Sequence, residues 1–432
     1  MYLLYDIALF LSAFFLVPYY GIKGMNRGRV RRGIGERFGF YDSAKLRTLA
    51  GRPIIWIHAV SVGETRAAIP LISVLREAYP HHALVLSNVT ETGQEVSAAI
   101  KDLDLRVFFP FDFSWVIRRV LRSIRPEMVV IVETEIWPNF IRHSRNLGIP
   151  VVLVNGRISD RSYPRYRKVA RFLRPVLREV SAFCMQSQQD ADRIIDLGAD
   201  PDRVHSTGNL KFDLQPPSFG KMERDRLRAE YSIPPGTRVW CAGSTHAGEE
   251  EQVLRVYSRI RETEESVFLI LAPRHPERCV DIEILLQRWN LGFVRRSEIT
   301  SQGELKAGDV LLVDTLGEML KLYTLSDVVF VGGSLVEVGG HNVLEASMLK
   351  KPVCFGPHMH NFKEISRLVT DAGGGVQVAN EAELLKITQE FLAHPEKCRE
   401  MGEKGFSLIA SNQGATRRSI NIIGHLIPYG NP

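Results

Sequence analysis

The chain has 432 residues, of which 45% are apolar and 24% charged, and its formal net charge is +6. This composition is typical of a folded protein of two or three domains and excludes large-scale disorder. The five cysteines are odd in number and form no C-x-x-C pair, which argues against a disulfide framework and a structural zinc site.

Residues 1–22 are an apolar run in which Asp6 is the only charge. At ~1.5 Å per residue, a helix of this length covers roughly the thickness of a bilayer core. Nine Lys or Arg residues follow between positions 23 and 52. Positive flanks stay in the cytoplasm, so we expect a membrane anchor with the body on the cytoplasmic face. A helix in the plane of the interface and a buried soluble helix are the alternatives. A cleaved signal peptide would carry its positive charges before the apolar run.

From residue 53 onward, apolar segments rich in Val and Ile alternate with amphipathic segments. This pattern predicts parallel sheets covered by helices. In the first half we expect strands at 54–58, 83–87, 106–109, 128–132, 151–155 and 182–186. A stretch with a Pro pair and several glycines, 207–236, indicates a domain boundary. In the second half we expect strands at 239–242, 267–271, 292–294, 310–313, 328–331 and 353–355.

We therefore expect an anchor over 1–22 and two Rossmann-like α/β domains, over 23–212 and 213–432, with a cleft between them. Ligands of such sheets bind at the carboxyl ends of the strands. Candidate site residues are therefore those that directly follow a strand.

Two acidic motifs follow predicted strands in the first half. HAVSVGE places Glu64 at the start of a helix, where the helix dipole favours a carboxylate and lowers its pKa. Such a residue is either a helix-terminal charge or a general base whose basicity a partner restores. VETEIWPN places Glu133 and Glu135 two positions apart, on one face if the strand continues. One of them is a site candidate, and the other is a candidate cap for a helix beginning at Pro138–Asn139.

Two basic features accompany these acids. Residues 155–178 contain eight Lys or Arg and a single acid, Asp160. No nucleic-acid-binding motif accompanies them, so lipid phosphates are the better candidate ligands. Lys211, in TGNLKFD, lies at the predicted boundary. It is either a solvated linker residue or a contact for a ligand that meets both domains.

The second half has three strand ends suited to a nucleotide phosphate. Ser244 and Thr245 precede a helix, and Arg274 follows a strand, free to bind a phosphate. VGGSLVEVGGHNVLEA has glycines that let a ligand approach the backbone, then a helix starting near Asn342 and carrying Glu345 one turn later. Neither a P-loop nor a strand-linked G-x-G-x-x-G is present, which argues against a P-loop enzyme and a dinucleotide dehydrogenase.

Taken together, HAVSVGE, VETEIWPN, TGNLKFD, STHAGEE, PRHPER, GGSLVEVGGHNVLEA and the early GERFGFY resemble the Kdo (3-deoxy-D-manno-octulosonic acid) transferase family. The resemblance covers nearly the whole chain, with the motifs in the family's order. It implies the GT-B fold, with the acceptor on the first domain, the sugar nucleotide on the second, and a C-terminal helix that returns to the first domain. Residues 415–428 are the candidate for that helix.

The resemblance also implies the roles of individual residues. Glu64 is implied as the general base, and Glu133 and Lys211 as transition-state stabilisers. The implied CMP site consists of Pro273, Arg274, Leu316, Gly317, Glu318, Asn342, Val343, Leu344 and Glu345.

The implied reaction is transfer of Kdo from CMP-Kdo to a hydroxyl of tetra-acylated lipid A precursor, with inversion, at the cytoplasmic face of a bacterial inner membrane. We expect no metal or other cofactor and no nucleic-acid partner. Two alternatives remain: another GT-B sugar-nucleotide enzyme, either a UDP-sugar transferase or a 2-epimerase, and a non-catalytic protein that binds anionic lipid.

Overall fold

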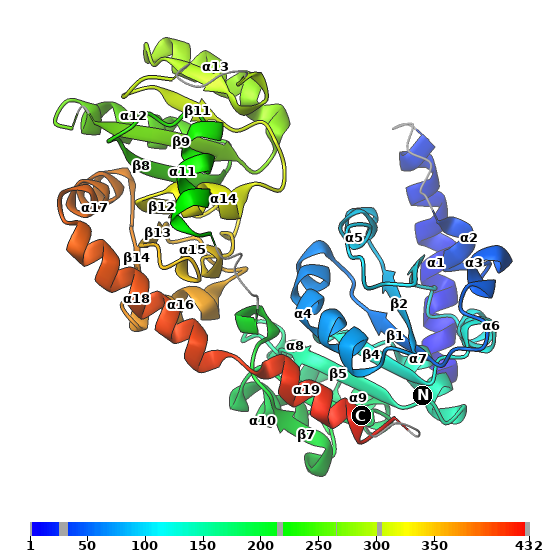
Figure 1. The fold of residues 1–432 in the computed structure, drawn as a ribbon. Coiled ribbons are helices and arrows are strands. Elements are labelled where there is room, and N and C mark those ends of the chain that lie inside the picture. Colours follow the sequence, from blue (N-terminus) through cyan, green and yellow to red (C-terminus); the bar gives the residue numbers. More distant parts are fainter. Residues whose placement is uncertain (1, 26–32, 214–218, 265, 300–304, 428–432) are drawn as a thin grey trace. The chain divides into compact units, whose positions relative to one another are not determined.

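The computed structural model describes residues 2–25, 33–213, 219–264, 266–299 and 305–427 (Figure 1). The chain forms two compact units. Unit 1 consists of residues 1–214 together with 412–432, and unit 2 of residues 215–411. The sequence-based division assigned 213–432 to one domain, and the structure differs by returning the C-terminal segment to unit 1.

Unit 1 is built on a seven-stranded parallel sheet with the order β3-β2-β1-β4-β5-β6-β7. The strands are β1 (Ile54–His58), β2 (Ala83–Asn88), β3 (Leu105–Phe108), β4 (Met128–Val132), β5 (Val151–Gly156), β6 (Ala182–Met185) and β7 (Val204–Ser206). The helices are α1 (Tyr2–Met25), α2 (Ile34–Arg37), α3 (Ser43–Arg47), α4 (Val62–Ala78), α5 (Glu91–Ser97), α6 (Ser114–Ile124), α7 (Pro138–Asn146), α8 (Tyr163–Lys168), α9 (Ala170–Leu177), α10 (Gln188–Asp196) and α19 (Ala415–Gly424), with short 3-10 turns η1 (Pro201–Arg203) and η2 (Leu210–Asp213).

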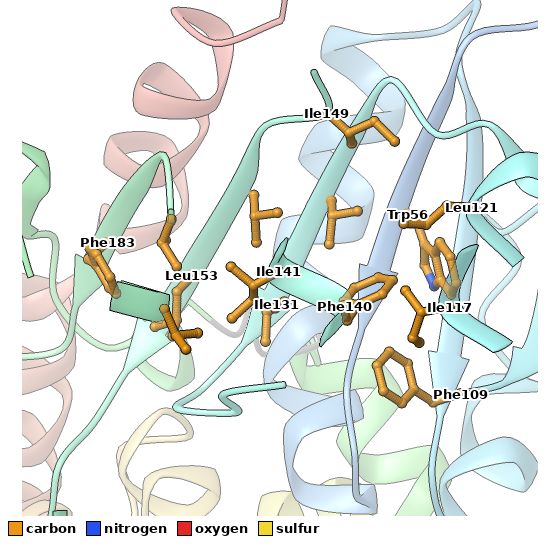
Figure 2. Packing of buried hydrophobic residues seen from close by; sticks show 14 of the residues in the cluster. Trp56, Phe109, Ile117, Leu121, Ile131, Phe140, Ile141, Ile149, Leu153 and Phe183 are labelled. Carbon is orange, nitrogen blue, oxygen red and sulfur yellow. The ribbon is translucent and has the colours of Figure 1, made fainter. Parts of the chain in front are cut away.

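The central strands of this sheet are buried on both faces, because segments such as β4 are apolar at every position and alternate their side chains between two cores. Trp56 of β1 packs with Phe109 and Phe140 in the core that Figure 2 shows. The neighbouring Ile55 and Ile57 enter the opposite core, which α4 and α19 cover. A sheet sandwiched in this way exposes only its edges, and the carboxyl edge is where loops can form a site.

Unit 2 repeats the architecture with the strand order β10-β11-β9-β8-β12-β13-β14. The strands, all paired in parallel, are β8 (Arg238–Thr245), β9 (Val267–Pro273), β10 (Phe293–Arg295), β11 (Val310–Leu312), β12 (Val328–Val331), β13 (Val353–Phe355) and β14 (Gly375–Gln377). The helices are α11 (Lys221–Glu230), α12 (Glu249–Arg261), α13 (Cys279–Arg288), α14 (Met319–Leu325), α15 (Leu344–Ser347), α16 (Lys363–Asp371), α17 (Glu381–Ala393) and α18 (Pro395–Asn412), with 3-10 turns η3 (Pro276–Arg278) and η4 (Arg296–Glu298).

The two parallel sheets confirm the α/β architecture expected from the sequence, and each predicted strand is present to within three residues at either end. The edge strands β7 and β14 were not predicted. Each has only three residues and carries partly exposed positions, so neither shows a continuous apolar run.

Helix α1 packs against unit 1 through polar contacts on one face. The Tyr5 hydroxyl donates to Asp112 at 2.9 Å, the Asn139 amide donates to Asp6 at 2.7 Å, and the Arg142 guanidinium lies over the Tyr2 ring. The exposed large apolar side chains of this helix are Leu3, Leu4, Ile7, Phe10, Leu11 and Phe14. In the part of the chain that the structure describes, no helix combines the length and the apolar character needed to cross a membrane. The side chains of Tyr19 and Tyr20 and the basic residues 27–32 lie outside the described part.

Helix α19 belongs to unit 1, so the C-terminal helix returns to the first domain as expected. Asp213 accepts hydrogen bonds from the backbone amides of Gly414, at 2.6 Å, and Thr416, at 2.5 Å, so its carboxylate caps the start of α19. Ile420 and Ile423 of the helix enter the core beside α4.

Candidate active site

In unit 1 the chain reverses direction across the sheet between β1 and β4, which are adjacent although β2 and β3 separate them in sequence. A crevice forms outside the carboxyl ends of strands at such a switch point. Glu64 follows β1 and Glu133 follows β4. Both acids, predicted from the sequence, therefore follow the two strands that flank the switch point.

Glu64 is half-buried in the first turn of α4, within a capping box. Ser61 accepts from the Glu64 amide and donates its hydroxyl to the Glu64 carboxylate at 3.2 Å. The Val60 amide donates to the other carboxylate oxygen at 2.5 Å. Burial, followed by the negative charge of Glu133, raises the pKa of Glu64 to about 7, against the opposing hydrogen bonds from Val60 and Ser61. A carboxyl group with this pKa is suited to act as a base near neutral pH.

Glu133, the residue directly after β4, is in the left-handed region, with φ of 61°. Its amide still donates to the carbonyl of Val154 at 2.8 Å, so the turn begins at its own α-carbon. A non-glycine residue in this conformation is strained and is often found at functional sites. The strand ends at Val132, as predicted, so the condition under which Glu133 and Glu135 would share one face of a continuing strand is not met.

Lys211 lies near Glu133, with its ammonium nitrogen 3.7 Å from a carboxylate oxygen and only 17% of its side chain exposed. The turn η2 that carries it is fixed by Asn155, whose side-chain oxygen accepts from the Leu210 amide at 3.0 Å. Lys211 is therefore a partly buried partner of the acidic group and not a solvated linker residue.

Glu135 completes the acidic group. Burial, followed by the charge of Glu133, raises the pKa of Glu135 to about 7. Neither acid caps α7, contrary to one of the two readings of the motif. The cap comes from Asp112, whose carboxylate accepts from the amides of Asn139, at 3.0 Å, and Phe140, at 2.8 Å.

Unit 2 has a corresponding switch point between β8 and β12. Ser244, at the end of β8, is left-handed with φ of 58°, and the neighbouring Thr245 is fully buried. Arg274 directly follows Pro273 at the end of β9, and its amide donates to the Thr245 carbonyl at 2.9 Å. The predicted residues Ser244, Thr245, Pro273 and Arg274 therefore lie on adjoining loops at one edge of the sheet.

The segment 316–318 precedes α14, and pattern reasoning alone did not find it. Leu316 is exposed, and Gly317 adopts a φ of 84° that favours glycine. Glu318 accepts hydrogen bonds from Thr315 and, at 2.8 Å, from the Tyr231 hydroxyl, and it pairs with Arg296 at 3.4 Å. Although burial opposes it, these partners hold the pKa of Glu318 below its usual range.

Asn342 and Glu345 contact each other at the start of α15, with the Asn342 amide 3.4 Å from a Glu345 carboxylate oxygen. Between them, Val343 and Leu344 are fully buried. Only the backbone of these two residues is therefore suited to contact a ligand. Helix α15 has four residues, so the helix expected near Asn342 is a single turn.

Most of the predicted basic segment 155–178 lies on the exposed surface of α8 and α9. Arg171, Arg174 and Arg178 share one face of α9 and, with Pro175, line a hollow of about 490 Å³. The opposite face of α9 is buried in the core through Leu173, Val176 and Leu177. These cations are therefore placed on the molecular surface.

Comparison with known proteins identifies the family. Residues 32–214 match the family described as 3-deoxy-D-manno-octulosonic-acid transferase (kdotransferase). A 3-deoxy-D-manno-octulosonic acid transferase of Haemophilus influenzae is 34% identical to this chain over 94% of both sequences. One of Chlamydophila psittaci is 30% identical over 98% of this chain and 96% of its own. The chain belongs to the 3-deoxy-D-manno-octulosonic acid transferase family.

The protein is therefore a glycosyltransferase of this family. Solved structures support the fold of the transferase. A glycosyltransferase from Rickettsia africae is 11% identical and covers 88% of this chain and 100% of its own, with a TM-score of 0.59. A UDP-GlcNAc 2-epimerase from Neisseria meningitidis, bound to UDP-GlcNAc, is 12% identical over 86% of this chain and 99% of its own, with a TM-score of 0.58. Both likenesses extend over the two units of the transferase and concern its architecture alone.

Proposed function

We propose that the transferase moves Kdo from CMP-Kdo to a hydroxyl of tetra-acylated lipid A precursor, with inversion, and that Glu64 is the general base. The observation that carries this proposal is the environment of Glu64. It is a half-buried carboxyl group at the switch point of unit 1, and its pKa is raised to about 7 by burial and by Glu133. The names of the relatives support the sugar that is transferred.

In this mechanism Glu64 accepts the proton of the acceptor hydroxyl as the oxygen attacks the anomeric carbon. Inversion places this base on the face opposite the departing phosphate, as in inverting glycosidases. The anomeric carbon becomes oxocarbenium-like, and a nearby carboxylate such as Glu133 stabilises that positive charge. Lys211, 3.7 Å from Glu133, keeps the acidic group from accumulating uncompensated negative charge.

Unit 2 holds the donor in this proposal. Arg274 compensates the charge of the departing CMP phosphate, and Glu345 and the backbone of 342–344 bind the nucleotide. The 316–318 turn is the third contact, positioned by the bonds of Glu318 to Tyr231 and Arg296. We assign no step to a metal or another cofactor.

We further propose that α1 lies in the interface of an anionic membrane, at the cytoplasmic face of a bacterial inner membrane. Its polar face is bound to unit 1 through Tyr5 and Asp6, while Leu3 and Leu4 are 72% and 70% exposed. A helix with this division of faces suits the boundary between headgroups and acyl chains. The exposed arginines of α9 lie near α1, since Phe172 of α9 contacts the Tyr5 ring at 6.1 Å, and they suit lipid phosphates.

The reaction is tested by incubating the full chain with lipid A precursor and CMP-Kdo generated in situ from CTP and Kdo. The mass of the lipid should rise by one or more Kdo units. Competition by CMP and by UDP in the same assay distinguishes the nucleotide, because a UDP-sugar enzyme would respond to UDP. A lipid of unchanged mass, with active donor synthesis, would contradict the proposed function.

The membrane proposal has a separate test. The chain should co-sediment with vesicles containing phosphatidylglycerol and less with pure phosphatidylcholine vesicles. Replacing Leu3 and Leu4 with Asp should reduce binding, whereas Met222→Asp, an equally drastic change at an exposed apolar residue of unit 2, should not. Equal binding of all three proteins would contradict a role for α1.

A further inference from the structure

Three histidines follow three neighbouring strands of unit 2. His246 follows β8, His275 follows β9 and His341 lies in the loop after β12, and the order β9-β8-β12 places these strands side by side. The His246 and His341 rings are parallel, with their Nε2 atoms 2.9 Å apart, and the centroid of His275 lies 5.7 Å from that of His246. The cluster therefore lies at the switch point of unit 2, where a ligand is expected.

The loops that carry His246 and His341 are tied together by Glu249. This carboxylate is fully buried and accepts hydrogen bonds from four backbone amides: His246 at 3.0 Å, Gly333 at 2.6 Å, Ser334 at 2.8 Å and Leu335 at 2.7 Å. A buried acid with this many donors fixes its surroundings, because removing it would leave all four amides without a partner.

Gly333 lets the two rings approach. Its φ is 65°, and a β-carbon there would lie 3.0 Å from the His341 ring and 3.3 Å from the His246 ring. Both the backbone conformation and the space therefore favour glycine. The imidazole pair is held in place from two sides, by this glycine and by the Glu249 clamp.

The surroundings of the pair are cationic. Burial, followed by the charges of His275, Arg274 and Arg278, lowers the pKa of His246. Two acids nearby are engaged by other groups: Glu249 by the four amides and Glu250 by Arg278 at 3.2 Å. Glu277, an exposed residue, lies 3.8 Å from His275. The buried hydroxyl of Thr245, next to His246, makes no hydrogen bond to any described residue. Such a site attracts an anion that can accept several hydrogen bonds.

A metal is a weaker interpretation of three imidazoles. Within the described residues no group of three His, Cys, Asp or Glu side chains has an arrangement that could hold a metal ion. The His246 and His275 rings are nearly perpendicular, at 86°, and the Nε2 atoms of His246 and His341 point at each other and not at a common centre.

We infer that His246 and His341, with His275 beside them, recognise the carboxylate of the donor sugar. This inference rests on the proposed function and deepens it. The transferred sugar is an acid, and in a donor activated at its keto carbon the carboxylate and the phosphate are attached to that same carbon. A phosphate bound at Arg274 therefore brings the carboxylate to the loops that adjoin Arg274, where the imidazoles lie.

The hydrogen bond between the two Nε2 atoms needs one donor and one acceptor, so the pair shares a single N–H in this contact. Each neutral imidazole has one N–H, so the ring that accepts in this contact carries its proton on Nδ1. For both Nε2 atoms to donate to a carboxylate, that ring must change its tautomer or take up a proton, and the contact between the two Nε2 atoms must break. Binding of the donor should therefore break this contact, whereas binding of CMP, which has no carboxylate, should leave it in place. A purely structural histidine pair would show no such difference between the two ligands.

The experiment compares the KM for CMP-Kdo with the inhibition constant of CMP in full-length His246→Gln and His341→Gln. His275→Gln is included because its half-exposed side chain can be changed without unfolding the chain. His394→Gln, an exposed histidine beside Glu396, is the matched control. Folding of every variant is checked by thermal unfolding.

Losing a hydrogen bond to a charged group should raise the KM for CMP-Kdo about tenfold to a hundredfold in the two pair variants, and less in His275→Gln. The inhibition constant of CMP should change less than about twofold. The inference would be overturned if the KM for CMP-Kdo were unchanged both in folded His275→Gln and in either folded pair variant. It would also be overturned if the affinities for CMP and for CMP-Kdo fell by the same factor. A wild-type protein that uses neither ligand would instead overturn the proposed function on which it rests.

Discussion

The ammonium nitrogen of Lys211 lies 3.7 Å from a carboxylate oxygen of Glu133, at the end of the strand next to the one that Glu64 follows. Three carboxyl groups gather here with one lysine, and the pKa values of Glu64 and Glu135 are both raised to about 7. Interacting carboxyls of this kind titrate as a group and place a base in the neutral range. Burial is the main cause of the raised pKa of Glu64, and the charge of Glu133, which Lys211 is placed to compensate in part, adds to its control.

The pH dependence of the reaction should report this control. The base must be deprotonated, so kcat/KM should rise with pH through about 7 and level off above it. In Glu133→Gln the neighbouring negative charge is lost, and the rise should move to lower pH. In Lys211→Met a positive charge is lost, and the rise should move to higher pH. Profiles that shift in the same direction in both variants, measured by initial rates from pH 5 to 9, would count against this electrostatic account.

Glu135 should make the folded state sensitive to pH. Its pKa is about 7 in the fold and about 4.5 in the unfolded chain. The stability linked to this group is thus fully present below about 4.5 and is lost as the pH rises through 7. Glu135→Gln avoids this loss, so it should be more stable than wild type by about 1–3 kcal/mol at pH 8 and equal near pH 4.5. Urea unfolding at both values measures the difference, and an equal effect at both would refute the assignment.

Docking of α1 should depend on the hydrogen bonds of Tyr5 and Asp6. Tyr5→Phe removes the bond to Asp112, which also caps α7, and Asp6→Asn weakens the bond from Asn139. Each change should cost about 1 kcal/mol of docking free energy and speed proteolytic removal of α1. Leu3→Gln, on the exposed face, is the control. Cleavage at the wild-type rate in both docking variants would show that other contacts hold the helix.

The C-terminal helix should likewise detach when its cap is removed. Asp213→Ala leaves the amides of Gly414 and Thr416 without their acceptor and should cost about 1–2 kcal/mol. Hydrogen exchange along α19 should increase, while exchange along α12 of unit 2 should not change. Asp202→Ala, in the exposed turn η1, is the matched control, because it also removes one carboxylate but should leave exchange along α19 unchanged. Unaltered exchange in α19 would contradict this prediction and would mean that the packing of Ile420 and Ile423 alone keeps the helix on unit 1.

Most of the strands and the motif residues that follow them could be predicted from the sequence, because they depend on local periodicity. Apolar segments such as Met128–Val132 are strands with the predicted bounds, and Glu64 and Lys211 lie where the motifs place them. What could not be predicted comes from contacts distant in the chain. Asp112 caps a helix that starts 26 residues later, and His246 meets His341 across 95 positions. The left-handed turn at Glu133 also escaped prediction, because nothing in VETE shows that the residue directly after the strand adopts a positive φ.

The most direct test of the central claim is the single-turnover rate of Glu64→Gln, measured together with its affinity for CMP. Glutamine keeps an oxygen that can accept the bond from Val60 but cannot take up a proton from the acceptor. The rate of Kdo transfer should fall by about 10²–10⁴ at pH 8, with CMP binding unchanged. A variant that transfers the sugar at the wild-type rate would contradict the role of Glu64 as the base.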